Sequence, residues 1–212
     1  MTTLAIMKAR IADELARDDL TSQIAYAITD AIGAYQDERW FFNESRAVTF
    51  STVANQEFYD GDDAAAIATV QKIDYVKVYV GDQPYDLEPM MPSAIESAAT
   101  NGTSAGTPWS YCYYSESLRL YPVPDQAYTV RIGASILRAA PATDAEASNP
   151  WMTHAERLIR SRAKLELALH VLKDEALAAT MSQGVSEAWD QLKSRTNQIT
   201  QVGNGRVRAM EF

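Results

Sequence analysis

The sequence predicts an α+β fold, in which the N- and C-terminal helices form a helical bundle and an antiparallel β-sheet region is inserted between them. Apolar residues recur at helical spacing near both ends of the chain and alternate at strand spacing in its middle. The 212 residues are 47% hydrophobic. This length and composition suffice for a buried core and indicate one domain, or one domain with an appendage.

Four segments are expected along the chain. Residues 1–44 form an N-terminal helical hairpin, residues 45–140 form the inserted antiparallel β region, and residues 141–200 form the helices that complete the bundle. Residues 201–212, "QVGNGRVRAMEF", form a flexible, basic and partly apolar tail, because their two glycines disfavour a regular helix.

The hairpin is predicted from two amphipathic segments. The first has its apolar residues at helical spacing and is followed by Thr21 and Ser22, either of which can cap a second helix. Members of the two apolar faces are Leu4, Met7, Ile11 and Leu15, then Ile24, Ile28, Ala31 and Tyr35. Two such helices, joined by a short polar turn, should bury these faces together.

Three adjacent aromatic residues, Trp40, Phe41 and Phe42, lie where the helical pattern gives way to strands. Adjacent side chains point in different directions, so the three cannot all enter one core in an isolated strand or helix. They are therefore candidates for a subunit interface. A hinge packed entirely within the domain is the alternative.

The β region begins with the alternating residues Val48, Phe50 and Thr52. "IDYVKVYVGDQPYDLEPM" then predicts two strands about a Gly-Asp-Gln-Pro turn, with Val76 and Val78 on one face. A short helix is expected over residues 92–99, because proline suits a first helical position. The composition of "TNGTSAGTP" is typical of an exposed, mobile loop.

"WSYCYYSESLRLYPVPDQAYTVRIGASIL" predicts a strand, a tight turn, a strand, a corner and a last strand. Pro122 and Pro124 lack backbone donors, so ladder pairing should stop there and form the corner of a meander. Tyrosines are frequent in this predicted sheet: Tyr111, Tyr113, Tyr114, Tyr121 and Tyr128. Such residues more often make cross-strand or subunit contacts than a stacking platform.

The last part of the chain is predicted to be helical, with a break at "KDEA", residues 173–176. The apolar stripe before the break comprises Trp151, Leu158, Leu165, Leu169 and Leu172, and the stripe after it comprises Leu177, Met181, Val185, Ala188, Trp189, Leu192 and Ile199. Gly184 should weaken the second helix by up to about 1 kcal/mol relative to alanine.

Charge and cysteine content restrict the function classes. The net charge of −9 argues against a protein that grips nucleic acid, whose affinity comes mainly from lysine and arginine. The single Cys112 excludes an internal disulfide and is expected to be a buried, inert thiol. Charges at Lys8, Arg10 and Asp13 interrupt any signal peptide, and no apolar run approaches membrane-span length, so a cytoplasmic protein without membrane contact is expected.

No catalytic, cofactor-binding or metal-binding constellation is predicted. His154 and His170 are sixteen residues apart on one predicted helix and fall on nearly opposite faces, so they cannot share a metal within the chain. The pairs at 18–19 and 62–63 are adjacent aspartates in turn-like contexts, where capping is a commoner role than hydrolytic chemistry. We therefore predict a protein that is not an enzyme.

The order of these segments resembles the head-to-tail adaptor (connector or neck) proteins of tailed bacteriophages. The resemblance covers nearly the whole chain and lies in "AIGAYQDERWFFNES", "IDYVKVYVGDQPYDLEPM", "GTPWSYCYY", "LRLYPVPDQAYTVRI" and the Trp151 helix that leads to a long alanine-rich helix. The combination of "GTPWSY" with "LRLYPVPD" is its most specific part.

The resemblance implies a homo-oligomer, usually a twelve-fold ring, assembled in the host cytoplasm and located in the virion neck beneath the portal protein. DNA would pass through the ring without specific binding, and the next tail or neck protein would dock on it. A portal-docking role is implied for tail residues Arg206, Val207, Arg208, Met210 and Phe212, with plain disorder as the alternative. Rival functions are a carboxylate-dependent cell-wall hydrolase and a carbohydrate-binding or adhesion module of the tail.

Overall fold

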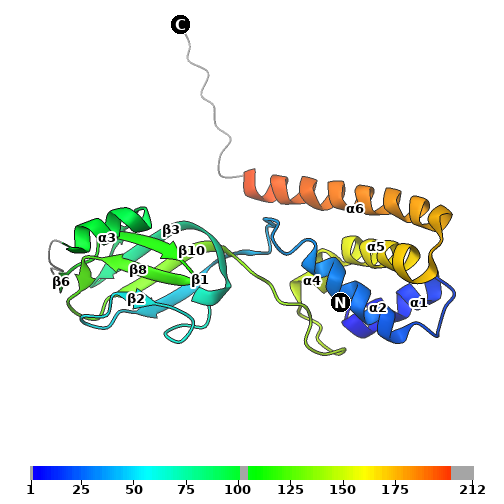
Figure 1. The fold of residues 1–212 in the computed structure, drawn as a ribbon, viewed down its shortest axis with the longest axis horizontal. Helices are drawn as coiled ribbons and strands as arrows, with labels where there is room; N and C mark the ends of the chain where they lie inside the picture. The colour runs from blue at the N-terminus through cyan, green and yellow to red at the C-terminus, as the bar shows by residue number, and fades with distance from the viewer. Residues whose placement is uncertain (1, 101–104, 202–212) are drawn as a thin grey trace, which may run out of the picture. The chain divides into compact units, whose positions relative to one another are not determined.

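The structure, a computed structural model, describes residues 2–100 and 105–201. The chain divides into two compact units (Figure 1). Residues 1–42 and 138–212 belong to the helical unit, and residues 43–137 belong to the β unit. The overall α+β class, with helices from both ends of the chain and a largely antiparallel β region between them, is as predicted.

The helical unit is built around α5. In Figure 1, α1 and α2 lie on one side of α5 and α6 runs along the other side. Its elements are α1 (Leu4–Glu14), α2 (Thr21–Gly33), α4 (Pro150–His154), α5 (Glu156–Glu166), a π-helical segment η2 (Leu167–Leu172) and α6 (Glu175–Gln201). None of the described helices is long and apolar enough to cross a membrane.

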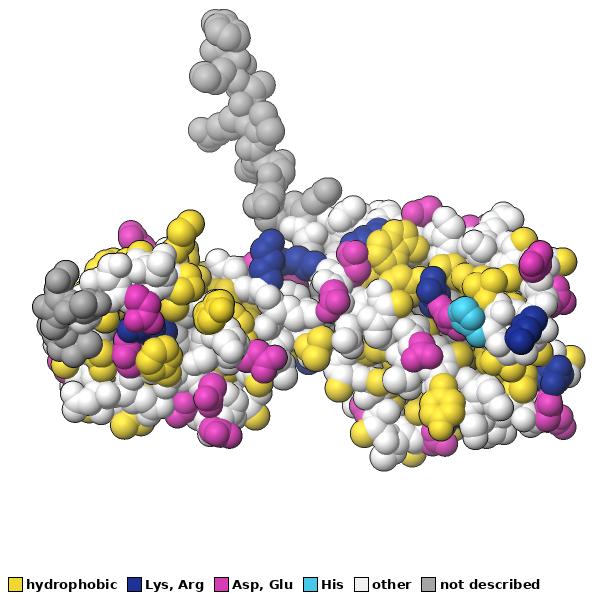
Figure 2. Space-filling model, in the orientation of Figure 1, with side chains coloured by type: hydrophobic (Ala, Val, Ile, Leu, Met, Phe, Trp, Pro, Cys, Tyr) yellow, Lys and Arg dark blue, Asp and Glu magenta, His cyan; other side chains and the backbone are white. Residues whose placement is uncertain are grey.

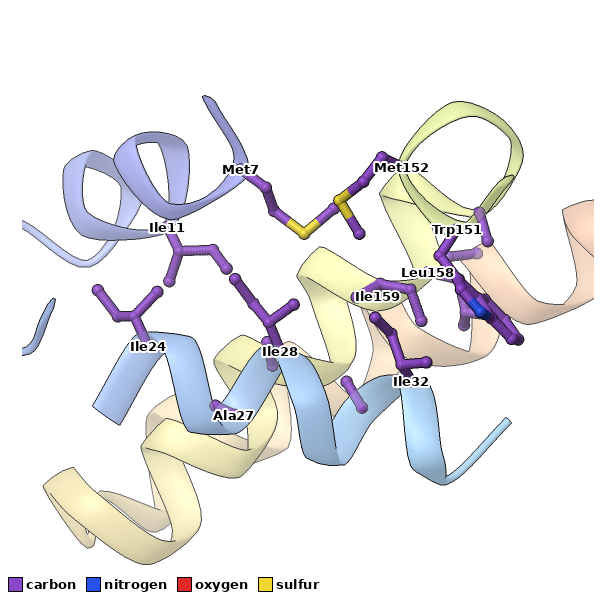
Figure 3. Close-up of a cluster of buried hydrophobic side chains, with 14 of the residues drawn as sticks. Met7, Ile11, Ile24, Ala27, Ile28, Ile32, Trp151, Met152, Leu158 and Ile159 are labelled. Atoms are coloured by element: carbon purple, nitrogen blue, oxygen red, sulfur yellow. The ribbon is translucent and has the colours of Figure 1, made fainter. Parts of the chain in front are cut away.

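The core of the helical unit joins the two ends of the chain. Figure 3 shows side chains of α1 and α2 meeting those of α4 and α5, and the labelled residues Met7, Ile11, Ile24, Ala27, Ile28, Ile32, Trp151, Met152, Leu158 and Ile159 are all buried. The predicted faces of the first two helices are therefore the buried ones. Because neither half could bury its apolar face alone, the unit requires both ends of the chain.

The start of α2 differs from the prediction. Thr21 is the first helical residue, Leu20 occupies the N-cap position, and no side chain accepts a hydrogen bond there. Neither Thr21 nor Ser22 caps the helix. Leu20 is buried in the core, and this packing, rather than a polar cap, holds the chain at the start of α2.

The helix predicted after Trp151 is interrupted twice. Ala155 leaves helical geometry between α4 and α5, and the π-helical segment η2 follows α5. A π turn contains more residues than an α turn and rotates the apolar stripe. Leu169, predicted to be part of that stripe, is consequently 45% exposed.

The break at residues 173–176 is confirmed. Lys173 has a left-handed backbone conformation with φ 55°, and α6 begins at Glu175. The Asp174 carboxylate accepts a hydrogen bond from the Leu177 backbone N–H at 2.9 Å, which satisfies one donor of the new helix.

The β unit contains two four-stranded sheets and one short parallel pair. The first sheet has the order β1-β10-β3-β4 and is antiparallel throughout, and the second has the order β2-β8-β7-β5. The elements are β1 (Glu44–Ser51), β2 (Phe58–Tyr59), η1 (Ile67–Thr69), β3 (Val70–Val80), β4 (Gln83–Asp86), β5 (Glu88–Pro89), α3 (Pro92–Thr100), β6 (Ala105–Gly106), β7 (Ser110–Tyr114), β8 (Ser117–Tyr121), β9 (Val123–Pro124) and β10 (Thr129–Ile136).

Side chains of both sheets share one core. Val48, Val76 and Val130 from the first sheet and Tyr59 and Leu118 from the second are fully or almost fully buried in one cluster. The predicted inward residues Val48 of β1 and Val76 of β3 are therefore confirmed. The helix predicted over residues 92–99 is α3, which packs on β7.

The proline corner was predicted to belong to one meander, and this is wrong. β8 and β10 lie in different sheets, so the stretch between them carries the chain from one sheet to the other. The β7–β8 ladder ends at Tyr121 as predicted, but β9 still pairs with β6 in parallel. Outside this pair, the Pro124 carbonyl accepts a hydrogen bond from the Asn55 N–H at 2.8 Å.

Two predicted connections are shorter than expected. The β3–β4 turn contains only Gly81 and Asp82, since Gln83 already pairs with Val80, and Gly81 supplies a φ of 59°. The loop predicted at "TNGTSAGTP" is partly strand, because Ala105 and Gly106 form β6. Residues 101–104 of that loop lie outside the described part of the chain.

Candidate assembly surfaces

The predicted chemical candidates are not brought together. His154 ends α4, and His170 lies in η2 with its ring 3.2 Å from the Glu166 carboxylate. The earlier prediction placed both on one continuous helix, and the break at Ala155 moves His154 out of it. Over residues 2–100 and 105–201, no group of three or more His, Cys, Asp or Glu residues could hold a metal ion.

The paired aspartates have local structural partners. Asp19 makes an ion pair with Arg17 at 2.7 Å in the α1–α2 loop. Asp63 accepts hydrogen bonds from the Gln56 amide at 2.8 Å and from the Asp60 backbone at 3.1 Å. The two pairs belong to different units, and each fits a turn role.

Cys112 is buried in β7, and burial raises the pKa of its thiol. A protonated thiol is a poor nucleophile, so the prediction of an inert cysteine is confirmed by its environment. Its cross-strand neighbour Arg119 is also buried and is held by the carboxylates of Glu57 and Glu96, with the Phe58 ring 5.0 Å away.

The five tyrosines of the predicted sheet do not form one platform. Tyr111 and Tyr113 point into the core, where the Tyr113 hydroxyl donates to the Ile67 carbonyl at 3.0 Å. Tyr128 is buried at the start of β10, in the other sheet. Tyr114 is exposed, whereas Tyr121 packs edge-on against Trp109 at 5.7 Å. This arrangement offers no row of coplanar rings to a sugar.

The aromatic residues Trp40 and Phe42 lie at the centre of the helical unit. Trp40 has no exposed surface, and its indole N–H donates to the Tyr35 carbonyl at 3.1 Å. Trp189 of α6 packs edge-on against Trp40 at 5.2 Å, and Trp151 packs edge-on against Phe42 at 5.3 Å. In this structure these two interface candidates pack within the chain, which is the alternative that the sequence left open.

Phe41, the third candidate, remains partly exposed. Its ring contacts His154 at 5.1 Å, and the Arg195 guanidinium lies 4.9 Å from its centroid. Burial, with a smaller contribution from Arg195, lowers the pKa of His154, so this imidazole is neutral at neutral pH. A partly exposed aromatic ring under an arginine is a common feature of protein interfaces.

The net negative charge is concentrated in the β unit. Residues 43–137 contain twelve Asp or Glu and five Lys or Arg, a net charge of −7, whereas the rest of the chain contributes −2. On the face shown in Figure 2, acidic side chains are spread over the β unit with little basic surface. The sequence could not show this location, because it depends on which segments fold together.

The predicted portal-docking residues lie outside the described part of the chain. Residues 202–212, and with them Arg206, Val207, Arg208, Met210 and Phe212, follow the last described residue of α6.

The sequence was compared with models of protein families and with curated proteins. A protein-family model described as "SU10 adaptor protein" matches residues 2–209, which include both units. No curated protein matches the sequence.

Proposed function

The chain belongs to the SU10 adaptor protein family of phage head-to-tail adaptors, and from this premise we propose that its copies form a ring, most simply of twelve, beneath the portal protein. The family places the protein at the head–tail junction of the virion. In our proposal the ring extends the DNA channel, closes the filled head and offers a docking surface to the next tail protein. The observation that carries the proposal is the family match over both units.

We propose that the DNA passes without specific binding. The net charge of −7 on the β unit supports this, because a surface with excess carboxylates repels phosphates. Such a surface displaces no counterions from the phosphates of a passing duplex, so it gains no binding free energy from their release and does not hold the DNA.

We also propose a structural role without catalysis. The histidines and aspartate pairs of the described residues are separated, and each has a packing or turn partner. The tail from Gly203 to Phe212 docks on the portal in this proposal, since it combines two arginines with Val207, Met210 and Phe212. A tail that orders only on binding defers its entropy cost until the contacts exist.

The test is to mix the full-length protein with the portal protein of the same genome and to measure particle mass by light scattering. A variant that ends at Gln201 is the matched comparison. We expect a large complex with the full chain and at least about a tenfold loss of apparent affinity without residues 202–212.

The outcomes separate the parts of the proposal. A complex that forms equally well with the shortened chain would keep the portal contact and remove the role of the tail. If neither chain forms a complex with the portal, the proposed place beneath the portal is wrong.

A further inference from the structure

Gly184 lies in the middle of α6 without any structural requirement for glycine. It is on a 27-residue helix, where glycine costs up to about 1 kcal/mol relative to alanine. Apart from the backbone of its own helix and its two chain neighbours, a Cβ built at this position has no atom within 4 Å, and its φ is not positive. The helical unit by itself therefore gains nothing from this glycine, whereas a bare backbone does permit another chain to approach closely.

An open cavity is bordered by α6 from Ala188 to Arg195, and Gly184 lies one helical turn before Ala188. At about 100° per residue, Gln191 and Arg195 lie on the same flank as Gly184, and Lys193 lies on the opposite flank. The cavity measures about 280 Å³ and lies between α6 and the α4–α5 junction. We call this surface the Gly184 groove. It comprises the cavity residues Thr153, Arg157, Gln191 and Arg195, with Ala188 and Leu192 as its apolar floor, and it continues one turn along the same flank of α6 to Gly184.

The rim of the Gly184 groove is basic. Arg195 stacks on Phe41 and makes no ion pair with any residue that the structure describes. Arg157 donates to Gln191 at 2.9 Å and has only a long, exposed ion pair with Glu187 at 3.4 Å. Glu156 also borders the cavity, but its carboxylate is bound to Arg10 and Arg160.

Another surface of the same unit has the complementary character. Tyr26 is 70% exposed, Leu169 45% and Val171 39%. Tyr26 and Val171 border a second cavity, of about 160 Å³, together with the exposed Asp30 and with Glu166. We call Tyr26, Asp30 and Val171 the Tyr26 patch. It shares no residue with the Gly184 groove, and it combines large apolar side chains with negative charge.

We propose that the Gly184 groove of one copy receives the Tyr26 patch of a second copy. This inference rests on the ring of the proposed function, because a head-to-tail ring needs two different surfaces that fit each other. The apolar patch covers the bare helix backbone at Gly184, and Asp30 approaches the unpaired Arg195. Phe41, beneath Arg195, then becomes part of the same subunit contact.

The first experiment fills the groove without weakening the subunit. Gly184→Leu replaces a poor helix former with a good one, so the helical content and melting temperature should stay equal or rise. Assembly, measured as particle mass with and without the portal protein, should weaken by at least about tenfold. Gln183→Leu adds the same side chain one residue away, about 100° around the helix, and should assemble like the wild type.

The second experiment tests the occupant by mixing variants. Gly184→Leu retains the Tyr26 patch, and Val171→Asp retains the Gly184 groove. Each variant alone should stay monomeric, whereas an equimolar mixture should form a heterodimer that grows no further, because only one pair of intact surfaces exists. Circular dichroism of both variants verifies that they fold.

Three results would overturn the inference. Wild-type assembly by Gly184→Leu would exclude the groove, and wild-type assembly by Val171→Asp would exclude the patch as occupant. A mixture that contains only monomers would show that the two surfaces are not partners. If the wild type forms no oligomer, alone or with the portal protein, the proposed ring itself fails, and this result differs from the other three.

Discussion

The two units of this protein use their charged residues differently. In the helical unit, ion pairs join segments from opposite ends of the sequence, as in Lys164 with Glu14 and Lys193 with Glu38. The β unit contains twelve acidic residues and only five basic ones, so its carboxylates outnumber its cations by seven. Charge therefore helps to hold the helical unit together, whereas in the β unit it mainly creates a negative surface.

The units also differ in which parts of the sequence supply their cores. The helical core needs aromatic residues from three distant places in the sequence, namely Trp40, Trp151 and Trp189. The β core is closed by two sheets formed within one continuous segment, residues 43–137. A defect in one core should therefore remain confined to its own unit, which the following variants test.

The largest effect is expected for Trp40→Ala. Removing this fully buried ring leaves a cavity beside Trp189 and Phe42 and removes the hydrogen bond to Tyr35, so the helical unit should lose about 3 to 5 kcal/mol. Hydrogen exchange followed by mass spectrometry should show lost protection in peptides from 2–42 and 138–201. Equal loss in peptides from 44–136 would contradict independent units.

A smaller effect, confined to the β unit, is expected for Gly133→Ala. The Tyr75 ring covers Gly133, and a Cβ would lie 2.3 Å from that ring. Displacing the ring should cost about 1 to 2 kcal/mol of unfolding free energy, measured with urea. In a Tyr75→Ala background, Gly133→Ala should lower the unfolding free energy much less, because the obstructing ring is gone. An equal loss in both backgrounds would show that the strain does not come from the Tyr75 ring.

The two units should also respond differently to mild acid. The pKa of His154 is lowered in the folded state, so the unfolded state binds more protons once the pH falls below about 6.5. The contribution of His154 to the stability of the helical unit is therefore fully present well above pH 6.5 and declines as the pH falls through and below that value. His154→Gln should flatten this decline. The β unit contains no histidine and serves as the internal control.

The smallest effect is expected for Lys164→Met, which removes the ion pair with Glu14 while keeping the apolar stem. Exposed or half-exposed ion pairs contribute about 0 to 1 kcal/mol. The loss in melting temperature of the helical unit should shrink in 1 M salt, because salt screens the pair in the wild type. A loss that is independent of salt would show that packing of the lysine stem, not its charge, was removed.

Sequence periodicity predicted the fold class and most elements because helix and strand patterns are local. The break at residues 173–176 and helix α3 were found in this way. The single meander and the buried Leu169 were wrong for one common reason. Strand partners and the rotation of a helix in a π turn depend on contacts that no local period records.

The candidate surfaces could be predicted only in part. The sequence singled out Trp40, Phe41 and Phe42 but could not tell which rings are buried, since this depends on residues 189 and 195 of α6. Gly184 was recognised as a weakening of its helix. Its position beside an open basic cavity could not be recognised, because the cavity also requires Thr153 and Arg157.

The sequence by itself determined that helices at both ends enclose a β insertion and that its motifs resemble phage adaptors. From the net charge of −9 it predicted little affinity for nucleic acid. The tertiary structure decided which apolar residues are core and which remain exposed, and where the negative charge lies. The physical reason is that burial and local electric field are properties of segments brought together from more than a hundred residues apart, as in Trp40 and Trp189.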